Sequence, residues 1–173
     1  QNPRIVMNGN APRSFYQGDG DRSRPRAHYE GLPVDFVTEA ITTLGLANSE
    51  GFRSYDVMNP HDDGISVDTF VDWLVEDGHT IDIIDDYDEW LSRFETALRG
   101  LPDDQRRSSV LPLLDAYRAP GHPRRGADTP TDQFRKAVQN YKIGSDDDSA
   151  DIPHIDHALI TKYISDLRAH GLL

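Results

Sequence analysis

The hydrophobic positions of this chain follow mostly helical periods, with a few short alternating runs that are typical of strands. After an irregular segment over residues 1–33, four apolar residues recur at intervals of three and four positions. This spacing predicts an amphipathic helix whose buried face is Val37, Ala40, Ile41 and Leu44. Asp35 is the expected N-cap, and Gly45 stands near the expected end.

The stretch Tyr55–Leu74 is the most informative part of the sequence because it combines a strand pattern, a turn and a helix start. Phe52–Met58 is predicted to be a strand with Tyr55 and Val57 on one face, closed by a turn at Asn59-Pro60. Ser66 is then expected to cap a helix that ends before Gly78. Its predicted buried face is Val67, Phe70, Val71 and Leu74.

The rest of the chain has mainly helical periods. The alternation of Ile81 and Ile83 predicts a second short strand. Four helical segments follow: one opened by Asp86 or Asp88, one over residues 103–118 broken near Pro112, one capped by Thr131, and a last one over residues 156–170. In this last helix, Leu159, Ile160, Tyr163, Ile164 and Leu167 are the expected buried face. The predicted fold is α+β and helix-dominated, with a single lobe over residues 34–173.

Composition narrows the classes of function. The 173 residues contain no cysteine, which excludes disulfides, thiolate metal sites and cysteine nucleophiles. A net charge of -12 argues against nucleic-acid binding, which needs a basic face. The chain has neither an apolar run long enough for a membrane span nor a basic-then-apolar leader, so we expect a cytoplasmic protein.

Two groups of residues could suggest a metal ion, and neither has the right spacing. Asp19, Asp21, Ser23 and Glu30 occupy positions 1, 3, 5 and 12 of a calcium loop, but Arg24 stands where that loop needs glycine. His154 and His157 flank Asp156, which is more simply the N-cap of the last helix. We therefore predict no metal site.

Catalytic motifs are missing from the sequence. There is no G-x-G-x-x-G pattern for a dinucleotide, no phosphate-binding P-loop and no G-x-S-x-G elbow. None of the seven tyrosines is followed four positions later by the lysine that short-chain reductases use. No catalytic residue is therefore assigned.

Many segments, in order along the chain, share one resemblance: Ala11–Tyr16, Arg26–Val37, Tyr55–Leu74, Asp85–Tyr87 with Trp90, Arg93–Leu98, Leu111–Leu114, Pro130–Arg135, Lys142–Gly144, Asp151–His154 and Gly171–Leu173. Together they resemble the C-terminal lobe of the thioester reductase domain of bacterial carboxylic acid reductases, which is of the extended short-chain dehydrogenase type. The resemblance spans residues 11–173, whereas residues 1–10 fit it poorly.

The resemblance implies a fold and a role. The parent enzymes use ATP and NADPH and reduce an acyl thioester, held on a phosphopantetheinyl carrier domain, to an aldehyde. Their NADPH-binding, doubly wound half carries the catalytic threonine or serine, tyrosine and lysine. That half is not part of this sequence, so this chain is expected to be a substrate-binding lobe that is inactive alone and binds no cofactor itself.

Candidate substrate-binding residues lie in two places. Phe15, Tyr16, His28 and Tyr29 precede the first helix, and Met58, Asn59 and Pro60 follow the expected strand. For the aromatics the alternative is core packing, and for Asn59-Pro60 it is a rigid turn. Expected partners are the nucleotide-binding half, the carrier domain and the acyl thioester. The rival interpretation is a non-catalytic module that docks the carrier domain or self-associates as a homodimer through an exposed apolar face.

Overall fold

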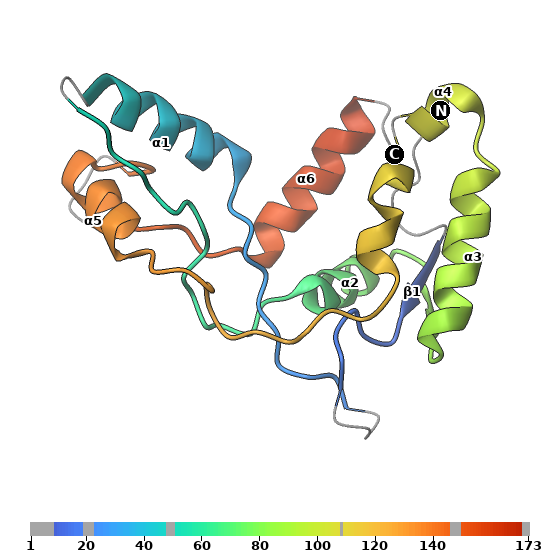
Figure 1. The fold of residues 1–173 in the computed structure, drawn as a ribbon. Helices are drawn as coiled ribbons and strands as arrows, with labels where there is room; N and C mark the ends of the chain where they lie inside the picture. The colour runs from blue at the N-terminus through green and yellow to red at the C-terminus, as the bar shows by residue number, and fades with distance from the viewer. Residues whose placement is uncertain (1–8, 19–22, 48–50, 108, 146–149, 171–173) are drawn as a thin grey trace. The chain divides into compact units, whose positions relative to one another are not determined.

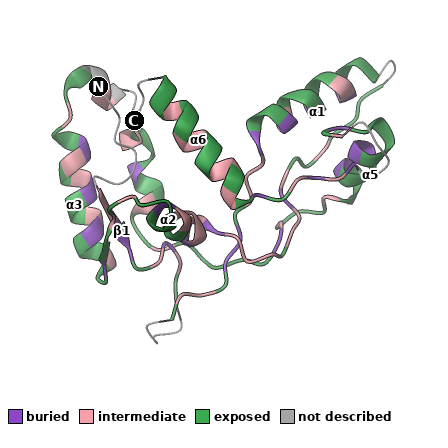
Figure 2. Cartoon of the chain, turned by 180° about the vertical axis from the view of Figure 1, so that it is seen from behind, coloured by how far each residue is buried: buried purple, intermediate pink, exposed green. Residues whose placement is uncertain are grey.

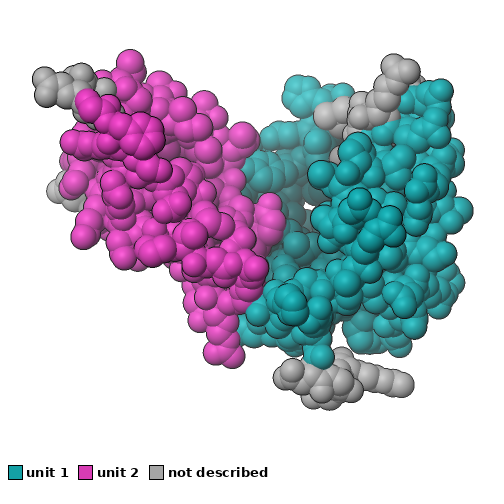
Figure 3. Space-filling view, in the orientation of Figure 1, with its two compact units in different colours: residues 1–27, 66–123, 156–173 teal, residues 28–65, 124–155 magenta. Residues whose placement is uncertain are grey.

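The computed structural model describes residues 9–18, 23–47, 51–107, 109–145 and 150–170, and the chain divides into two compact units. Unit 1 is Gln1–Ala27, Ser66–Pro123 and Asp156–Leu173, and unit 2 is His28–Ile65 and Arg124–Ile155 (Figure 3). Each unit is thus assembled from segments that are far apart in the sequence.

Helices account for most of the regular structure (Figure 1). In chain order the elements are β1 (Asn10–Pro12), α1 (Val34–Ala47), α2 (Val67–Glu76), β2 (Asp82–Ile84), α3 (Tyr87–Arg99), α4 (Asp103–Arg107), the 3₁₀ helix η2 (Leu111–Tyr117), α5 (Asp132–Tyr141) and α6 (His157–Ala169). The helix-dominated α+β prediction agrees with this composition. None of the helices formed by the described residues is long and apolar enough to cross a membrane.

Unit 1 is built on a two-stranded parallel sheet and an aromatic core. β1 pairs with β2 in the register Ala11 to Ile83, and the Arg13 N–H extends the ladder by donating to the Ile84 carbonyl over 2.9 Å. Trp90 of α3 is 1% exposed at the centre of the core, where it stacks on Phe94 and meets Phe15 edge to face. The buried stripe of α3 recurs once per turn, as its sequence period predicts (Figure 2).

The helix starts of unit 1 follow from local chemistry. Ser66 is the N-cap of α2, and its N–H donates to the Thr69 hydroxyl over 3.1 Å. The carboxylates of Asp86 and Asp156 accept from backbone N–H groups three residues on, at the starts of α3 and α6. These three caps confirm the predicted helix boundaries to within a residue.

Unit 2 is built from two helices and long loops. Phe36, Ala40 and Leu44 of α1 pack with Phe134, Ala137 and Val138 of α5, and Phe36 meets Phe134 edge to face at 6.2 Å between ring centroids. Ile143 and Ile152 complete the core. Gly144, at φ +78°, lets the chain leave α5 next to the Phe36 ring, where a Cβ would come within 2.9 Å.

The structure corrects the expected strand over Phe52–Met58, which is irregular backbone in unit 2. A strand needs a hydrogen-bonded neighbour, and the β-strand β2 pairs instead with β1 in unit 1. The chain at Asn59 is held by the loop at Glu30, whose carbonyl accepts from the Asn59 N–H over 3.1 Å. The alternating pattern therefore reflects partial burial of Tyr55 without a sheet.

The predicted face of α1 is also shifted. Phe36, Ala40 and Leu44 are buried, whereas Ile41 is 65% exposed. The face turns toward Phe36 because this ring packs on Phe134 of α5, a contact that helical spacing alone does not show. Asp35 lies inside the first turn and is not the N-cap, because α1 begins at Val34.

The last helix, α6, has the predicted bounds but not the predicted burial. Its five expected core residues, Leu159, Ile160, Tyr163, Ile164 and Leu167, are only partly buried. Within unit 1 its main neighbour is α2. A single neighbouring helix covers only part of a helical surface, so the apolar stripe stays half-exposed.

Candidate functional site

Five of the seven predicted site residues come together in unit 2, around the buried side chain of Asn59. Asn59 is 1% exposed, and its amide nitrogen donates to the Tyr29 carbonyl over 3.1 Å. Its amide oxygen accepts from the His61 N–H at 3.1 Å, and its backbone carbonyl lies 2.9 Å from His28 Nε2. Every polar group of the side chain that points inward is therefore used, and the loops at 28–30 and 58–61 are fixed to each other.

His28 is 5% exposed and joins the two loops through one ring nitrogen. Because a carbonyl oxygen can only accept, Nε2 donates to the Asn59 carbonyl. Among the described residues, Nδ1 has no hydrogen-bond partner. The His28 ring therefore supports the loop at Asn59 through a single hydrogen bond.

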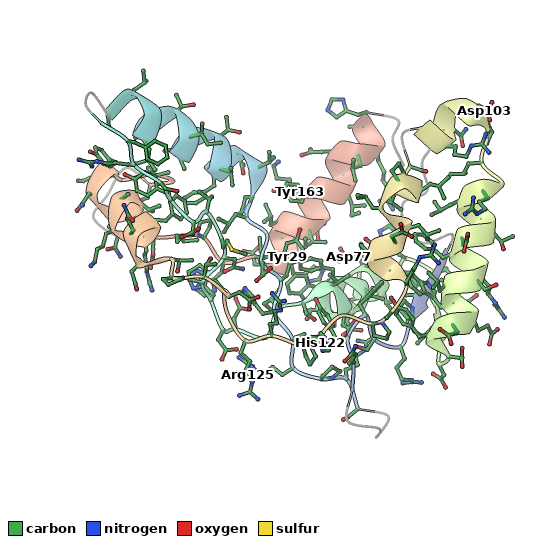
Figure 4. All side chains as sticks on the ribbon, in the orientation of Figure 1. Tyr29, Asp77, Asp103, His122, Arg125 and Tyr163 are labelled. Atoms are coloured by element: carbon green, nitrogen blue, oxygen red, sulfur yellow. The ribbon has the colours of Figure 1, made fainter. Side chains whose placement is uncertain are left out.

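Tyr29, which is labelled in Figure 4, is 37% exposed and is the exposed member of the cluster. Its ring lies so close to Gly31 that a Cβ at that position would overlap the ring. Its carbonyl and N–H are both fixed, by Asn59 and by the Ile65 carbonyl at 2.9 Å. A rigid backbone therefore presents a partly exposed phenol ring, which suits contact with a ligand.

The loop over residues 124–130 completes the surroundings of Met58 and Pro60. The Thr129 hydroxyl lies 3.2 Å from the Met58 sulfur. A Cβ at Gly126, whose φ is +68°, would come within 3.3 Å of the Pro60 carbonyl, so the two loops approach closely only with glycine there. Arg124 pairs with Asp128 and approaches Glu30 at 3.7 Å.

Two histidines stack beside this cluster. The rings of His61 and His154 are 3.5 Å apart at 18°. His61 Nε2 lies 2.8 Å from the Ile152 carbonyl, and His154 Nδ1 lies 3.0 Å from an Asp63 oxygen. Burial alone would raise the pKa of Asp63, but the Ile65 N–H and His154 outweigh it and hold that pKa below its ordinary value.

No metal centre is formed by the described residues. His154 and His157, considered together in the sequence, separate in the structure: His154 contacts Asp63 in unit 2, and His157 Nε2 lies 2.9 Å from Asp77 in unit 1. Of the calcium-like loop, Asp19 and Asp21 lie outside the described residues.

The other two candidates, Phe15 and Tyr16, lie in unit 1. Phe15 is 7% exposed and packs edge to face on Trp90 at 5.4 Å, so it takes the core-packing role that was the alternative for it. The Tyr16 hydroxyl accepts from the Val67 N–H at 3.4 Å, at the start of α2. Both aromatics therefore hold the N-terminal segment against unit 1.

Asp68 is the buried residue that sequence reasoning missed. It lies in the first turn of α2, where an acidic residue is ordinarily solvated, yet it is 5% exposed. Its carboxylate accepts from the Ser14 hydroxyl at 2.6 Å and the Phe15 N–H at 2.8 Å. Burial raises its pKa, against the lowering effect of these two hydrogen bonds. Its partners are more than fifty positions away, so no local pattern could reveal them.

No family model matches the chain. It is 56% identical to a carboxylic acid reductase of Segniliparus rugosus and 58% identical to one of Mycobacterium marinum, in each case over 98% of this chain and 14% of the relative. The structure also superposes, with a TM-score of 0.82 and 53% identity, on the reductase domain of a nonribosomal peptide synthetase from Mycobacterium tuberculosis. That match covers 98% of this chain and 39% of the solved one, so this chain corresponds to part of a larger reductase domain.

Proposed function

We propose, because the chain is similar over 98% of its length to part of the carboxylic acid reductases, that it is the substrate lobe of a thioester reductase domain. The resemblance inferred from the sequence is confirmed by these similarities, and the role of the lobe within the domain is our inference. The chain spans 14% of the relatives, so the activity belongs to a longer polypeptide.

The Asn59 cluster is the observation that carries this role. A substrate lobe must present fixed contact groups to a flexible ligand without supplying the chemistry. Buried Asn59 and His28 join two loops whose hydrogen-bonded residues are 31 positions apart. Tyr29, Met58 and Pro60 belong to these two loops, so their backbone is held in place. Partly exposed aromatic and thioether groups on a rigid backbone suit an acyl chain or the pantetheine arm that carries it.

The proposed reaction needs groups from the rest of the domain. NADPH would supply the hydride, the carbonyl carbon of the carrier-bound thioester would accept it, and the carbon–sulfur bond would break to give an aldehyde and the carrier thiol. The expected catalytic serine or threonine, tyrosine and lysine would come from the nucleotide-binding half. Tyr29 and Met58 are proposed only to bind and orient the acyl-pantetheine.

The second candidate is a docking module for the carrier domain. It is favoured by the same exposed Tyr29, since a partly exposed aromatic ring also suits a protein interface. The two roles differ in what they recognise. A substrate lobe recognises the acyl-pantetheine even without the carrier protein, whereas a docking module recognises the carrier surface.

Kinetics of a reductase polypeptide that contains this lobe and its nucleotide-binding half would distinguish the roles. Tyr29→Ala and Met58→Ala should raise KM about tenfold for a free acyl-pantetheine thioester, with little change in kcat, as expected for lost binding contacts. Tyr141→Ala is the matched control, because Tyr141 is also in unit 2 and is 43% exposed.

If KM rises only for the carrier-borne thioester and not for the free one, the docking role is supported and the substrate-binding role is rejected. Unchanged KM for both substrates would overturn both roles. NADPH oxidation followed at 340 nm in all three variants gives the rates, and circular dichroism checks that each variant is folded.

A further inference from the structure

Unit 2 contains a second feature, a pocket that shares no lining residue with the Asn59 cluster. It has a volume of about 280 Å³ and lies among α1, α5 and the segment at residues 53–57. Ile41, Leu44, Val57 and Phe134 give it an apolar lining, and Arg53 and Tyr55 are its polar members. We propose that this pocket binds a small amphiphile with one negatively charged head group.

The charge of the head group follows from Arg53. In a chain with net charge -12, arginines readily find carboxylates, as Arg13, Arg24, Arg93, Arg99, Arg118 and Arg135 do. Arg53 differs, because it has no hydrogen-bond or ion-pair partner among the residues that the structure describes. A guanidinium that no described residue pairs, next to an apolar cavity, favours a carboxylate, sulfonate or phosphate whose tail enters the cavity.

The open space of the pocket follows from Gly45. This residue lies within α1, where glycine is less favourable than alanine by about 0.5–1 kcal/mol. Its φ is not in the left-handed region, so the backbone does not require glycine. A Cβ built at Gly45 meets no atom within 4 Å, and Gly45 itself lines the pocket. The glycine thus leaves room that any larger side chain would fill.

The size of the ligand follows from the volume and the lining. Cavities that hold drug-sized ligands start at about 300 Å³, so this pocket accepts a short tail only. The apolar wall reaches the surface at Ile41, a lining residue that is 65% exposed. A tail of medium length would cover part of this surface and lower its contact with water.

Calorimetric titration of the chain itself tests the assignment. Octanoate and octanesulfonate, both below their micelle concentrations, should bind with one saturable site, and octanol should bind about tenfold more weakly because it lacks the charge. Octylamine should not bind. A preference for octanoate would assign the natural ligand to the carboxylates, and a preference for the sulfonate would assign it to the tetrahedral oxyanions.

Three variants separate the pocket from a nonspecific surface. Arg53→Gln should weaken octanoate about tenfold and leave octanol unchanged. Gly45→Leu should abolish binding of both, while circular dichroism shows that the helix content is kept. Arg125→Gln is the charge-matched control, because Arg125 also lies in unit 2, is exposed, and has no ion-pair partner among the described residues (Figure 4).

Three outcomes would overturn the assignment. They are equal affinity for octanoate and octylamine, an equal loss of octanoate binding in Arg53→Gln and Arg125→Gln, and octanoate affinity unchanged in Gly45→Leu. These readouts involve no catalysis, so they do not depend on the role proposed for the Asn59 cluster.

Discussion

The two units hold their irregular segments by different kinds of buried polar group. In unit 1 the segment at Ser14 and Phe15 is fixed by the carboxylate of Asp68, and in unit 2 the loops at residues 28–30 and 58–61 are fixed by the amide of Asn59. Both side chains are at most 5% exposed. An amide is neutral at every pH, whereas a buried carboxylate must be kept charged at a cost in free energy.

The difference also extends to the cores. Unit 1 has a sheet and an aromatic cluster around Trp90, which would keep most of its contacts if one loop were released. Unit 2 has α1 and α5 and otherwise consists largely of loops. The hydrogen bonds of the Asn59 side chain therefore contribute a larger share of its stability. The comparison therefore teaches that unit 2 depends more on single hydrogen-bonding side chains.

Removal of the central ring of each core should have the largest effect. Trp90→Ala and Phe134→Ala should each cost about 3–5 kcal/mol, because both rings are at most 1% exposed. Amide hydrogen exchange should show faster opening mainly in the unit that was changed, with Trp90→Phe and Phe134→Leu as milder controls. Uniformly faster exchange in both units would show that they open together and would contradict the contrast between the two units.

Asn59→Ala should have the next largest effect and lower the free energy of unfolding by about 3 kcal/mol. The change removes the part-buried hydrogen bonds that the Asn59 side chain makes with the Tyr29 carbonyl and the His61 N–H, and loss of a buried hydrogen-bonding group costs about 1–3 kcal/mol. Urea unfolding followed by circular dichroism measures the loss. Asn140→Ala, an exposed change on α5, should cost about 0.5 kcal/mol or less. A similarly small cost for Asn59→Ala would show that the Asn59 hydrogen bonds do not stabilise unit 2.

Acid should affect the contribution of Asp68 in unit 1 and the contributions of Asp63 and Asp151 in unit 2 in opposite directions. The pKa of Asp68 is raised above 3.8, so its protonated form is favoured by folding, and its contribution to stability falls as the pH rises from 3.8 through the folded-state pKa. In unit 2, the Arg135 hydrogen bond holds the pKa of Asp151 below 3.8, and Asp63 is also lowered. The stability that they add is present above 3.8 and is lost as the pH falls through their folded-state pKa values.

Asp68→Asn should therefore become more stable relative to the wild type as the pH rises above 3.8. Asp151→Asn should become less stable relative to the wild type as the pH rises toward 3.8 from below. Trp73 and Trp90 are the only tryptophans and both are in unit 1, so fluorescence follows unit 1, while the histidine resonances of His61 and His154 follow unit 2. Asp72→Asn, at an exposed ion pair, is the control. Parallel pH profiles for the two variants would contradict the contrast between the units.

The smallest effects are expected at exposed ion pairs. Arg135→Gln removes a pair that joins α5 to the loop at Asp151, with Nε to oxygen at 2.8 Å, and should cost about 1 kcal/mol. Arg93→Gln removes a pair within α3 and should cost about 0.3 kcal/mol. Thermal unfolding at low and high salt measures both. A larger loss of stability for Arg93→Gln than for Arg135→Gln would show that exposed ion pairs stabilise unit 1 more than unit 2.

Local signals in the sequence were sufficient for most helices. Ser66, Asp86 and Asp156 were recognised as caps because a cap depends on residues within one turn. The error at Phe52–Met58 arose because alternation shows partial burial but not the neighbouring strand. Asn59, His28 and Tyr29 were all predicted as candidate site residues. The hydrogen bonds that join them were not predicted, because hydrogen bonds between loops leave no periodic pattern in the sequence.

The order in which the chain visits its two units limits how they can be separated or exchanged. The boundaries fall after Ala27, Ile65, Pro123 and Ile155, so each unit is interrupted by the other. A single proteolytic cut at any of these places cannot release a unit as one continuous peptide. For the same reason, recombination between related genes could exchange unit 2 intact only by replacing two separate stretches of the gene while keeping the one between them.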